Sequence, residues 1–599
     1  MDQADISLTC AWALVDEFVR AGATHACVSP GSRSTPLALA LARHPRIELH
    51  VHLDERSSAF FALGLAKTRL RPVLVACTSG TAVAELLPAV VEASQSRMPL
   101  VLLTADRPAR LRGTGANQTI DQPEIFGGYV RASLELPAPT KEGHAAWWRQ
   151  SAREALDAMA EGPPGPVHVN CPFEEPLTPS AAWTPPLTEA AWTPPPTEAE
   201  GMHDLGSHEP PELEPGQGDR FAEAVDGARG VVTIGGWPGD LWSEGMSWSQ
   251  GLGWPVLAEP TSNARLPQGP LSAGQALIGS TEWLERNRPE VVIQFGATPT
   301  TRATQDLMAN ADRLIVADRF HLDTDPERRA WMRLHVDPNE LSGAFADRPI
   351  AHGDGIMVVG PRTQDEIQRL WDRRIHPPPA EWTETWRRAD NVARTTLDAF
   401  IDGIDEPFEP RIARDVAAAV PDGGLLFVGN SKPIRDLDLT MAPREGLRVM
   451  ANRGASGIDG LVSTAMGIAA AGRGPTFSLL GDLSFLHDAG ALLWNATRNV
   501  DLVVVIVSNG GGQIFSLLPQ LELPEHRELF TTPSAVDLEA LCAAARAGYE
   551  RVERGAHLVP AIGRARQAEG IRVIDVIVDP ESDRRYRVEL QQTITAALG

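Results

Sequence analysis

The run LVVVIV, residues 502–507, constrains the fold of this chain more than any other stretch. A short, continuous run of Leu, Val and Ile is typical of a strand buried on both faces, as in a parallel sheet. It ends at Ser508-Asn509-Gly510-Gly511-Gly512, and an earlier apolar run, residues 477–480, ends at Gly481-Asp482. With the helical segment between them, these runs predict a strand–helix–strand unit. Both strands would end at one edge of a sheet, where α/β proteins bind ligands.

Asp482 and Asn509 therefore place a carboxylate and an amide oxygen close together, beside the backbone carbonyls of a glycine-rich turn. Such oxygen ligands suit Mg²⁺, which prefers an octahedral oxygen shell and commonly shares it with phosphate. A simpler interpretation is that Asp482 caps a helix and that Asn509-Gly510 is only a turn. Both interpretations stay open on this segment alone.

Length and composition indicate a multidomain globular protein. At ~150 residues per domain, a chain of 599 residues is expected to form three or four domains. A hydrophobic content of 43% with 22% charged residues is ordinary for a soluble protein. The net charge of −24 argues against general binding to nucleic acid or to anionic membranes.

The chain is expected to be cytoplasmic. Its five cysteines are widely spaced and form no C-x-x-C motif, which predicts buried, reduced thiols. The N-terminal residues MDQADISLTC lack the basic and apolar regions of a signal peptide. No run reaches the ~18 apolar residues that a membrane span needs.

Strand and helix patterns alternate along the chain, which predicts an α/β fold class with three consecutive α/β domains and mostly parallel sheets. The expected boundaries are a first domain at 1–180, a Pro-rich linker at 181–218, a central domain at 219–360, a helical connector at 361–405 and a third domain at 406–599. Strands are expected at 25–29, 47–53, 72–77, 100–104 and 166–170, then at 230–234, 255–258, 291–295 and 314–318, and finally at 424–428, 448–451, 476–480, 502–507 and 573–578.

Glu55 follows a predicted strand and precedes the apolar helical segment SSAFFALGLA. A partly desolvated carboxylate at this position has a raised pKa, which suits it to proton exchange near neutral pH. Taken alone, the residue is more simply interpreted as a helix N-terminal acid that the helix dipole stabilises.

Arginines recur at turns that follow predicted strands. Singly, each is interpreted as a surface charge. Together they predict a site for a substrate with several carboxylates, because the guanidinium group matches carboxylate geometry. The arginines are Arg33, Arg107, Arg302, Arg435 and Arg453, with Gln118, Ser32 and Ser431 as neighbouring polar side chains.

The loop at 454–460, GASGIDG, precedes a helix, and its glycines allow the backbone to approach a ligand closely. Its one large apolar residue, Ile458, is expected either to support a bent cofactor or to fill a gap in the core.

His25, His52 and His487 are each interpreted as structural residues. The sequence contains no Walker loop, Gly-x-Ser-x-Gly elbow or His-Glu-x-x-His motif.

Gly481-Asp482 followed by Asn509 resembles the GDG…NN signature of thiamine diphosphate enzymes. Leu483 replaces the last glycine of the signature and Ser508 replaces the first asparagine. The resemblance implies that Asp482, Asn509 and the backbone carbonyl of Gly511 hold Mg²⁺ or Mn²⁺ against the diphosphate of the cofactor.

Further motifs in the first and third blocks are similar to one branch of these enzymes, the 2-succinyl-5-enolpyruvyl-6-hydroxy-3-cyclohexene-1-carboxylate (SEPHCHC) synthases of menaquinone biosynthesis. In the middle block, ATPTTR (297–302) has Thr301 where this branch has a lysine. The motifs are SPGSRSTPL (29–37), HLDERSSAFFALGLAK (52–67), TADRP (104–108), GANQTIDQ (115–122), VGNSKPIR (428–435), NRGASGIDG (452–460) and NGGGQIFSLLP (509–519).

This resemblance implies decarboxylation of 2-oxoglutarate and 1,4-addition of the resulting succinyl carbanion to isochorismate. Thiamine diphosphate would bind between the first block of one subunit and the third block of another, in a homodimer or a dimer of dimers. Glu55 would contact the aminopyrimidine ring, and Ile458 would support the cofactor. The substrates would contact Ser32, Arg33, Arg107, Gln118, Arg302, Ser431, Arg435 and Arg453, with Ile514, Phe515 and Leu518 as an apolar wall.

Other functions are weighed against this one. Acetohydroxyacid synthases and 2-oxoacid decarboxylases use the same cofactor, but they process small monocarboxylates and need fewer arginines. The chain also lacks the His-His pair of pyruvate-decarboxylase-like enzymes. A non-catalytic regulator on the same fold would not need Glu55, Asp482 and Asn509 together.

Overall fold

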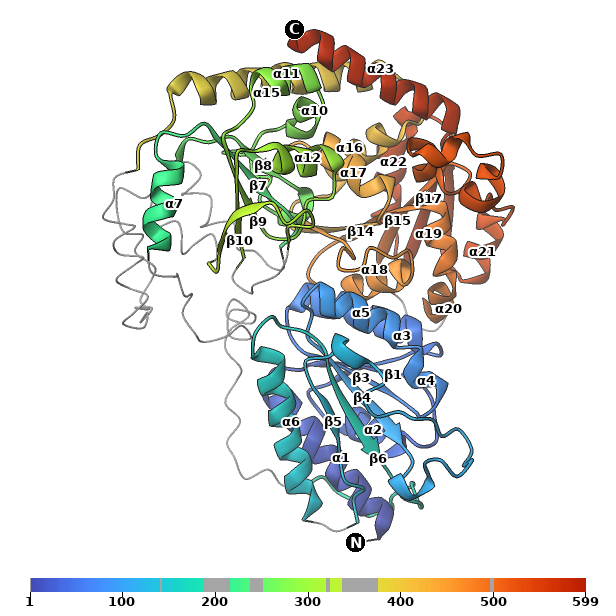
Figure 1. The fold of residues 1–599 in the computed structure, drawn as a ribbon. Coiled ribbons are helices and arrows are strands. Elements are labelled where there is room, and N and C mark those ends of the chain that lie inside the picture. The colour runs from blue at the N-terminus through green and yellow to red at the C-terminus, as the bar shows by residue number, and fades with distance from the viewer. Residues whose placement is uncertain are drawn as a thin grey trace.

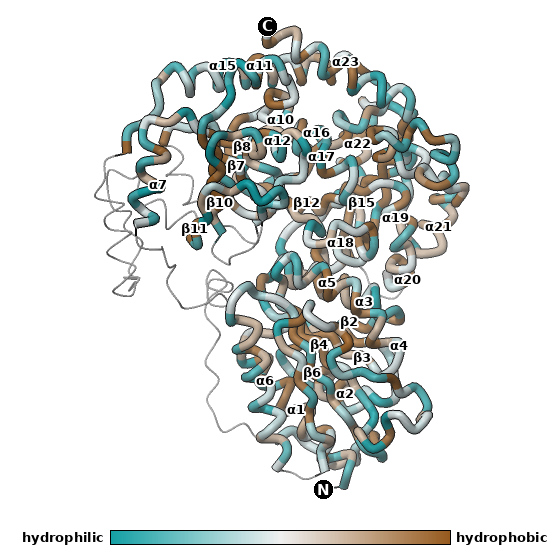
Figure 2. The backbone as a smooth tube through the Cα atoms, in the orientation of Figure 1, coloured by the Kyte–Doolittle hydropathy of each residue, from teal (hydrophilic) through white to brown (hydrophobic). Residues whose placement is uncertain are grey.

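A computed structural model describes residues 2–140, 143–186, 216–237, 252–318, 324–336, 375–495 and 500–599. Three parallel sheets form the molecule (Figure 1). The first block lies below, with the N-terminus at its far end, and the second and third blocks lie side by side above it. Hydrophobic residues concentrate along the strands of each block (Figure 2).

The first sheet has the strand order β2-β1-β3-β4-β6-β5. Side chains alternate between its faces, so that Cys27 packs with helices α3 and α5 while Ala26 and Val28 pack with α1, α2 and α6. The strands are β1 (His25–Val28), β2 (Glu48–Val51), β3 (Val73–Cys77), β4 (Leu100–Asp106), β5 (Ser133–Glu135) and β6 (Val167–Pro172). The helices are α1 (Gln3–Arg20), α2 (Thr35–Arg43), α3 (Glu55–Arg69), α4 (Thr81–Ala84), α5 (Leu87–Gln95) and α6 (His144–Ala160).

The second sheet has the order β11-β10-β9-β7-β8. Its strands are β7 (Gly230–Ile234), β8 (Val256–Ala258), β9 (Val291–Phe295), β10 (Arg313–Ala317) and β11 (Ala330–Leu334). Its helices are α7 (Gln217–Val225), α10 (Gly274–Ile278), α11 (Thr281–Arg286) and α12 (Arg302–Asn310).

The third sheet has the order β13-β12-β14-β15-β17-β16. Its central strand β15 (Leu502–Ser508) is buried from Leu502 to Val507, as its continuous apolar run predicts. The other strands are β12 (Gly424–Val428), β13 (Leu447–Met450), β14 (Thr476–Gly481), β16 (Gly548–Val552) and β17 (Ile571–Ile577). The helices are α16 (Glu409–Ala419), α17 (Lys432–Thr440), α18 (Leu461–Ala470), α19 (Asp482–His487), α20 (Leu492–Asn495), α21 (Leu538–Ala544), α22 (Gly555–Ala565) and α23 (Pro580–Leu598).

Two long helices tie the second block to the third. Helix α15 (Ala380–Asp402) and helix α23 cross the top of the molecule (Figure 1). Leu397 and Ile401 of α15 form one core with Leu590 and Ile594 of α23. Helix α15 lies within the segment where the helical connector is predicted, 361–405.

Helices α3 and α18 join the first block to the third, and two glycines let their backbones meet. A Cβ atom on Gly64 would lie 2.1 Å from the carbonyl oxygen of Thr464, and one on Gly467 would lie 2.0 Å from that of Phe61. No other residue type fits at either position without moving a helix. Since α3 begins at Glu55, this contact fixes where Glu55 lies relative to the third block.

The predicted fold class is confirmed, and every predicted strand is present with small changes at its ends. Three further strands, β5, β11 and β16, were not predicted, because they are short sheet-edge strands with polar residues (SLE, AWMRL and GYERV). The segment after β3 forms two helices, α4 and α5, and Pro88 lies in the first turn of the second. Parts of the predicted linker, central domain and connector, at 187–215, 238–251, 319–323 and 337–374, lie outside the described residues.

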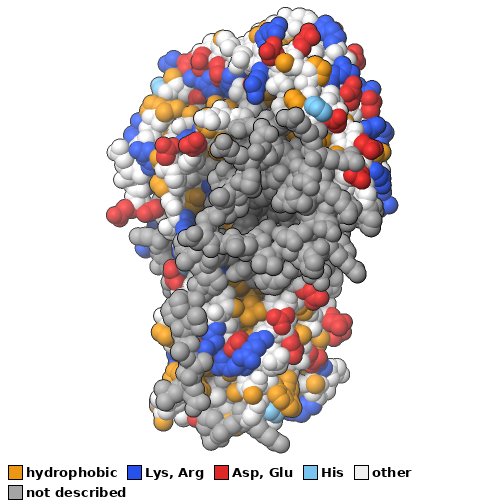
Figure 3. All heavy atoms as spheres, turned by 90° about the vertical axis from the view of Figure 1, so that its left-hand side faces the viewer, with side chains coloured by type: hydrophobic (Ala, Val, Ile, Leu, Met, Phe, Trp, Pro, Cys, Tyr) orange, Lys and Arg blue, Asp and Glu red, His pale blue; other side chains and the backbone are white. Residues whose placement is uncertain are grey.

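All five cysteines are free and buried, as predicted. None of the described helices is long and apolar enough to cross a membrane. Acidic and basic side chains lie interspersed in the upper, described part of the face in Figure 3.

Candidate active site

Asp482 and Asn509 lie at the carboxyl ends of neighbouring strands. Gly481 of β14 pairs with Val507 of β15, so the two strands end together. Asp482 Oδ1 accepts a hydrogen bond from the backbone N–H of Leu483 (2.7 Å), and its Oδ2 accepts one from that of Gly511 (2.9 Å). The carboxylate thus contacts the glycine-rich turn that follows Asn509.

The electrostatics of this pair fit a cation. Burial raises the pKa of Asp482 to about 6, although backbone N–H groups partly offset it, and the Asp575 carboxylate raises it further. Asn509 is buried, and its Oδ1 has no hydrogen-bond partner among the described residues. A buried carboxylate and a buried, unpaired amide oxygen are costly unless they gain a positive partner. The arrangement therefore suits a divalent cation better than a simple helix cap.

Glu409, which the sequence analysis missed, orients the Asn509 amide. Asn509 Nδ2 donates to Glu409 Oε1 at 2.9 Å, which leaves the buried Oδ1 as an acceptor without a partner among the described residues. The same carboxylate accepts from Lys432 Nζ at 2.6 Å, and Lys432 Nζ also donates to Asp583 at 2.7 Å. No motif pointed to Glu409, because it reaches Asn509 only through the packing of α16 against the sheet.

Glu55 is the first residue of α3 and is half-buried. Burial raises its pKa, and the nearby carboxylates of Asp54 and Glu85 raise it further, as expected from the sequence. The helix is capped by Asp54 instead, whose Oδ1 accepts from the backbone N–H of Arg56 (2.9 Å) and of Ser57 (3.2 Å). The side-chain cap of α3 therefore comes from Asp54 and not from Glu55.

The first block brings Arg33, Arg107 and Gln118 together at the end of its sheet. Arg107 Nη1 donates to Ser79 Oγ and to the carbonyl oxygen of Gln118 (3.0 Å). Arg33 donates to the carbonyl oxygen of Phe173 at 2.8 Å. Burial lowers the pKa of Arg107, and the nearby Arg33 cation lowers it further. Ser32, beside Arg33, is exposed in the turn after β1.

The third block brings Ser431, Arg435 and Arg453 together. Arg435 Nη1 donates to the carbonyl oxygen of Ser431 at 2.5 Å. Burial lowers the pKa of Arg453, the Arg435 cation lowers it further, and the Glu259 carboxylate opposes both. Glu259 follows β8 of the second block, so the middle block supplies an acidic residue that the sequence analysis missed.

Arg302 faces solvent at the start of helix α12. Its side chain is 80% exposed and forms an ion pair with Asp306 at 2.8 Å. No described contact joins it to Arg435 or Arg453. Its neighbour Thr301 caps α12, because its side chain accepts a hydrogen bond from the backbone N–H of Thr304. This gives the threonine a structural role at the position where a lysine was expected.

Ile458, the predicted cofactor support, and the predicted apolar wall of Ile514, Phe515 and Leu518 lie at or near the surface of this single chain. Ile458 is 40% exposed and Leu518 is 43% exposed. Ile514 and Phe515 lie half-buried in a short 3₁₀ helix after the glycine turn, and the Phe515 ring lies 5.4 Å from that of Phe530. Ile458 does not fill a core gap, which was the alternative interpretation.

The site residues form two half-sites within one chain, one around Glu55 in the first block and one around Asp482 in the third. Among the described residues, no hydrogen bond or ion pair joins Glu55 to Asp482, Asn509 or Gly511. One group offers a carboxylate with a raised pKa and two arginines, and the other offers cation ligands and two further arginines. Together they supply what a phosphorylated cofactor and an anionic substrate need.

Comparisons with known proteins agree with this geometry. Residues 8–125 match the N-terminal TPP binding domain of thiamine pyrophosphate enzymes, and residues 438–576 match their C-terminal TPP binding domain. Both groups of site residues thus lie in or beside matched segments.

Relatives extend the match along the whole chain. The chain is 40% identical to the SEPHCHC synthase of Thermobifida fusca (strain YX), over 98% of each chain. It is 38% identical to that of Myxococcus xanthus (strain DK1622), over 100% of this chain and 99% of the relative. It is 35% identical to that of Haloarcula marismortui, over 98% of each chain. The chain therefore belongs to the SEPHCHC synthase family of thiamine diphosphate enzymes.

Proposed function

We propose that this chain catalyses the thiamine diphosphate-dependent formation of SEPHCHC from 2-oxoglutarate and isochorismate, as part of menaquinone biosynthesis. One observation carries the proposal. The same chain has a sheet edge suited to a cation, formed by Asp482 and Asn509, and two groups of arginines. The family match supports the reaction class, and the arginine groups support anionic substrates.

Asp482 and Asn509 would hold Mg²⁺ or Mn²⁺ through their side-chain oxygens, with the backbone carbonyl of Gly511 as a third ligand. The unpaired Oδ1 of Asn509 and the raised pKa of Asp482 both favour a cation at this place. Thiamine diphosphate, when bound, supplies the stabilisation of a carbanion that the decarboxylation needs. The protein binds and orients the reactants and controls their protons.

Glu55 would exchange a proton with the aminopyrimidine ring of the cofactor. A carboxyl group does this best when its pKa lies closer to the working pH than the usual value. Burial and the neighbouring Asp54 and Glu85 move the pKa of Glu55 in that direction.

The arginines would hold the carboxylates of the substrates. Both substrates are dicarboxylates, and Arg33 and Arg107 form one cationic group while Arg435 and Arg453 form another. A guanidinium group binds carboxylate in a defined orientation. Gln118, Ser32 and Ser431 add polar contacts at the same sheet ends. Arg302 is also proposed as a substrate residue, although its side chain faces solvent beside Asp306 in this chain.

The active site would be shared between two copies of the chain. Leu53, two residues before Glu55, is 84% exposed, and Leu517, Leu518 and Leu529 beside the glycine turn are 47%, 43% and 63% exposed. Large exposed apolar side chains next to both half-sites are typical of a surface that another protein covers. A symmetric dimer would cover both surfaces and join Glu55 of one chain to Asp482 of the other.

The experiment that tests this function compares substrates. The purified protein with thiamine diphosphate and Mg²⁺ is given 2-oxoglutarate with isochorismate, or pyruvate alone, and CO₂ and products are measured. We expect CO₂ and SEPHCHC only with the first pair. Turnover of pyruvate alone would assign the chain to the decarboxylases or acetohydroxyacid synthases and overturn the proposal.

Arg453→Ala should reduce substrate use much more than cofactor binding. Loss of one charged hydrogen bond costs about 1.5–3 kcal/mol, so kcat/KM for 2-oxoglutarate and isochorismate should fall about 10- to 100-fold. The calorimetric affinity for thiamine diphosphate should stay within about twofold of wild type. Arg585→Ala is the matched control, because Arg585 is an exposed arginine of helix α23 that pairs with Glu589 and belongs to neither arginine group. The reverse pattern would move Arg453 to the cofactor.

A further inference from the structure

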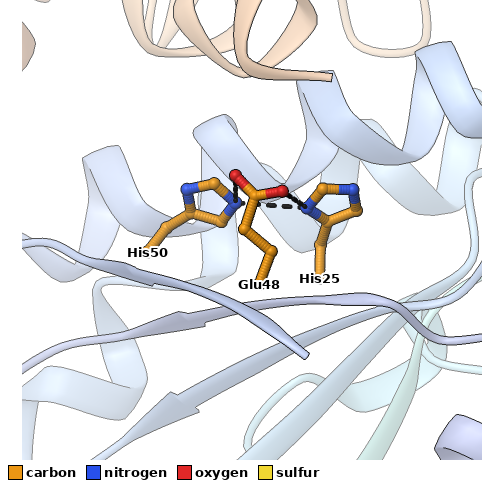
Figure 4. Close-up of side chains that lie close together, drawn as sticks. All are labelled: His25, Glu48 and His50. Atoms are coloured by element: carbon orange, nitrogen blue, oxygen red, sulfur yellow. Dashed lines mark hydrogen bonds and ion pairs between the residues drawn. The ribbon is translucent and has the colours of Figure 1, made fainter. Parts of the chain in front are cut away.

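His25, Glu48 and His50 form a cluster on the first sheet, away from both half-sites (Figure 4). His25 begins β1, and Glu48 and His50 lie on β2, with His25 paired to Glu48 and Cys27 paired to His50. Residues two apart on a strand point to the same face, so all three side chains gather on one side of the strand pair. Figure 4 shows the two rings facing each other with the carboxylate between them.

The distances suit a metal ion. His25 Nδ1 lies 3.2 Å from His50 Nε2. Glu48 Oε2 lies 3.8 Å from His25 Nδ1, and Glu48 Oε1 lies 3.8 Å from His50 Nε2. Ligands about 2.0–2.1 Å from a tetrahedral Zn²⁺ lie about 3.3 Å from each other. The two nitrogens already have this spacing, and the Glu48 side chain, 63% exposed, is able to close the small remaining gap.

The chemistry of the side chains also suits a metal. Both histidines are buried, and the Arg69 cation lies near His25. A neutral imidazole offers a lone pair, which is the form that binds metals. The same Arg69 cation disfavours a dication nearby, and the Glu48 carboxylate offsets that charge.

Space for the remaining ligands is present. Glu48 and His50 line a cavity of about 970 Å³ between the first and third blocks, whose other lining residues include Trp494, Asp501 and Glu569. Water from this cavity is able to complete the coordination shell. Imidazole nitrogens with one carboxylate favour Zn²⁺ and similar transition metals over Mg²⁺, which prefers oxygen ligands alone.

We propose that His25, Glu48 and His50 bind a divalent transition metal ion such as Zn²⁺ and that this ion fixes strand β2 to β1. β2 lies at one edge of the first sheet, where β1 is its one neighbour among the described strands. It leads directly into Asp54 and Glu55. The ion would therefore stabilise the strand that positions Glu55, without contact to the reactants.

Co²⁺ is the probe for this site, because its visible spectrum reports imidazole ligands. The full-length protein is freed of metal with EDTA and then given thiamine diphosphate and excess Mg²⁺, which occupy the oxygen-rich site. We expect one Co²⁺ per chain to bind in the presence of Mg²⁺, with a higher melting temperature on binding. His50→Ala should abolish this binding, and Glu48→Gln should weaken it at least tenfold.

His557→Ala is the matched control, since His557 is exposed on α22 and lies outside both sites. It should bind Co²⁺ as the wild type does. Glu48 is largely exposed, so Glu48→Gln decides the matter if His50→Ala proves unstable. Absence of Mg²⁺-resistant Co²⁺ binding in the wild type, or equal binding in wild type and Glu48→Gln, would overturn the proposal and leave a hydrogen-bonded histidine pair.

Discussion

Replacing Glu55 with Gln should lower turnover of 2-oxoglutarate with isochorismate by about 10²- to 10⁴-fold, the usual contribution of one acid–base group. Glutamine keeps the size and the hydrogen-bonding capacity of the side chain but cannot exchange a proton. The calorimetric affinity for thiamine diphosphate with Mg²⁺ should change little, because the diphosphate and metal contacts lie in the third block. Steady-state kinetics and calorimetry on the same preparation check both parts.

Glu85→Gln is the control for this variant. Glu85 is exposed at the end of the short helix α4, and it acts on Glu55 through its charge. Its loss should leave turnover within a few-fold of wild type. Equal turnover in Glu55→Gln and wild type would remove Glu55 from the chemistry, and lost cofactor binding would assign it to binding instead.

Asp482→Ala should abolish Mg²⁺-dependent binding of thiamine diphosphate. Even residues that only support a ligand change metal affinity about 10- to 100-fold, so loss of a charged ligand should weaken it more than about 100-fold. Calorimetry with and without Mg²⁺ measures the difference, and thermal unfolding checks that the variant is folded. Asp422→Ala is the control, because Asp422 is a surface residue of the third block that pairs with Arg444.

Retention of Mg²⁺-dependent affinity in Asp482→Ala would refute the ligand assignment.

A further test, of the shared active site, combines the two inactive variants. If each active site takes Glu55 from one chain and Asp482 from the other, a mixed dimer of Glu55→Gln and Asp482→Ala has one intact site. Equal mixing with free exchange should then restore about a quarter of wild-type activity, because about half of the dimers are mixed. No recovery despite demonstrated exchange would place both residues of each site in one chain.

The strand ends were predictable because they depend on local sequence. A continuous apolar run such as residues 502–507 is typical of a buried strand, and the glycines and polar residues after it mark the turn. Since parallel strands joined by a helix end at one edge, Asp482 and Asn509 could be placed together from their order alone. The exposed position of Arg302 could not be foreseen, because ATPTTR reads the same whether its arginine faces a site or solvent.

Burial and long-range pairing could not be read from the sequence. Glu259 acts on Arg453 because the second block packs against the third, and Glu409 orients Asn509 because helix α16 packs against the sheet of its own block. His25 was interpreted as structural, since nothing in the sequence gives the β1–β2 register that sets it beside Glu48 and His50.

The sequence by itself determined the α/β class, the order of the strands along the chain and the turns that carry Glu55, Asp482 and Asn509, because these follow from local hydrophobic periodicity and turn chemistry. Only the tertiary structure decided which carboxylates have raised pKa values, which amide oxygen lacks a partner and which arginines gather. These properties depend on desolvation and on contacts between residues that lie apart in the sequence, which no local pattern encodes.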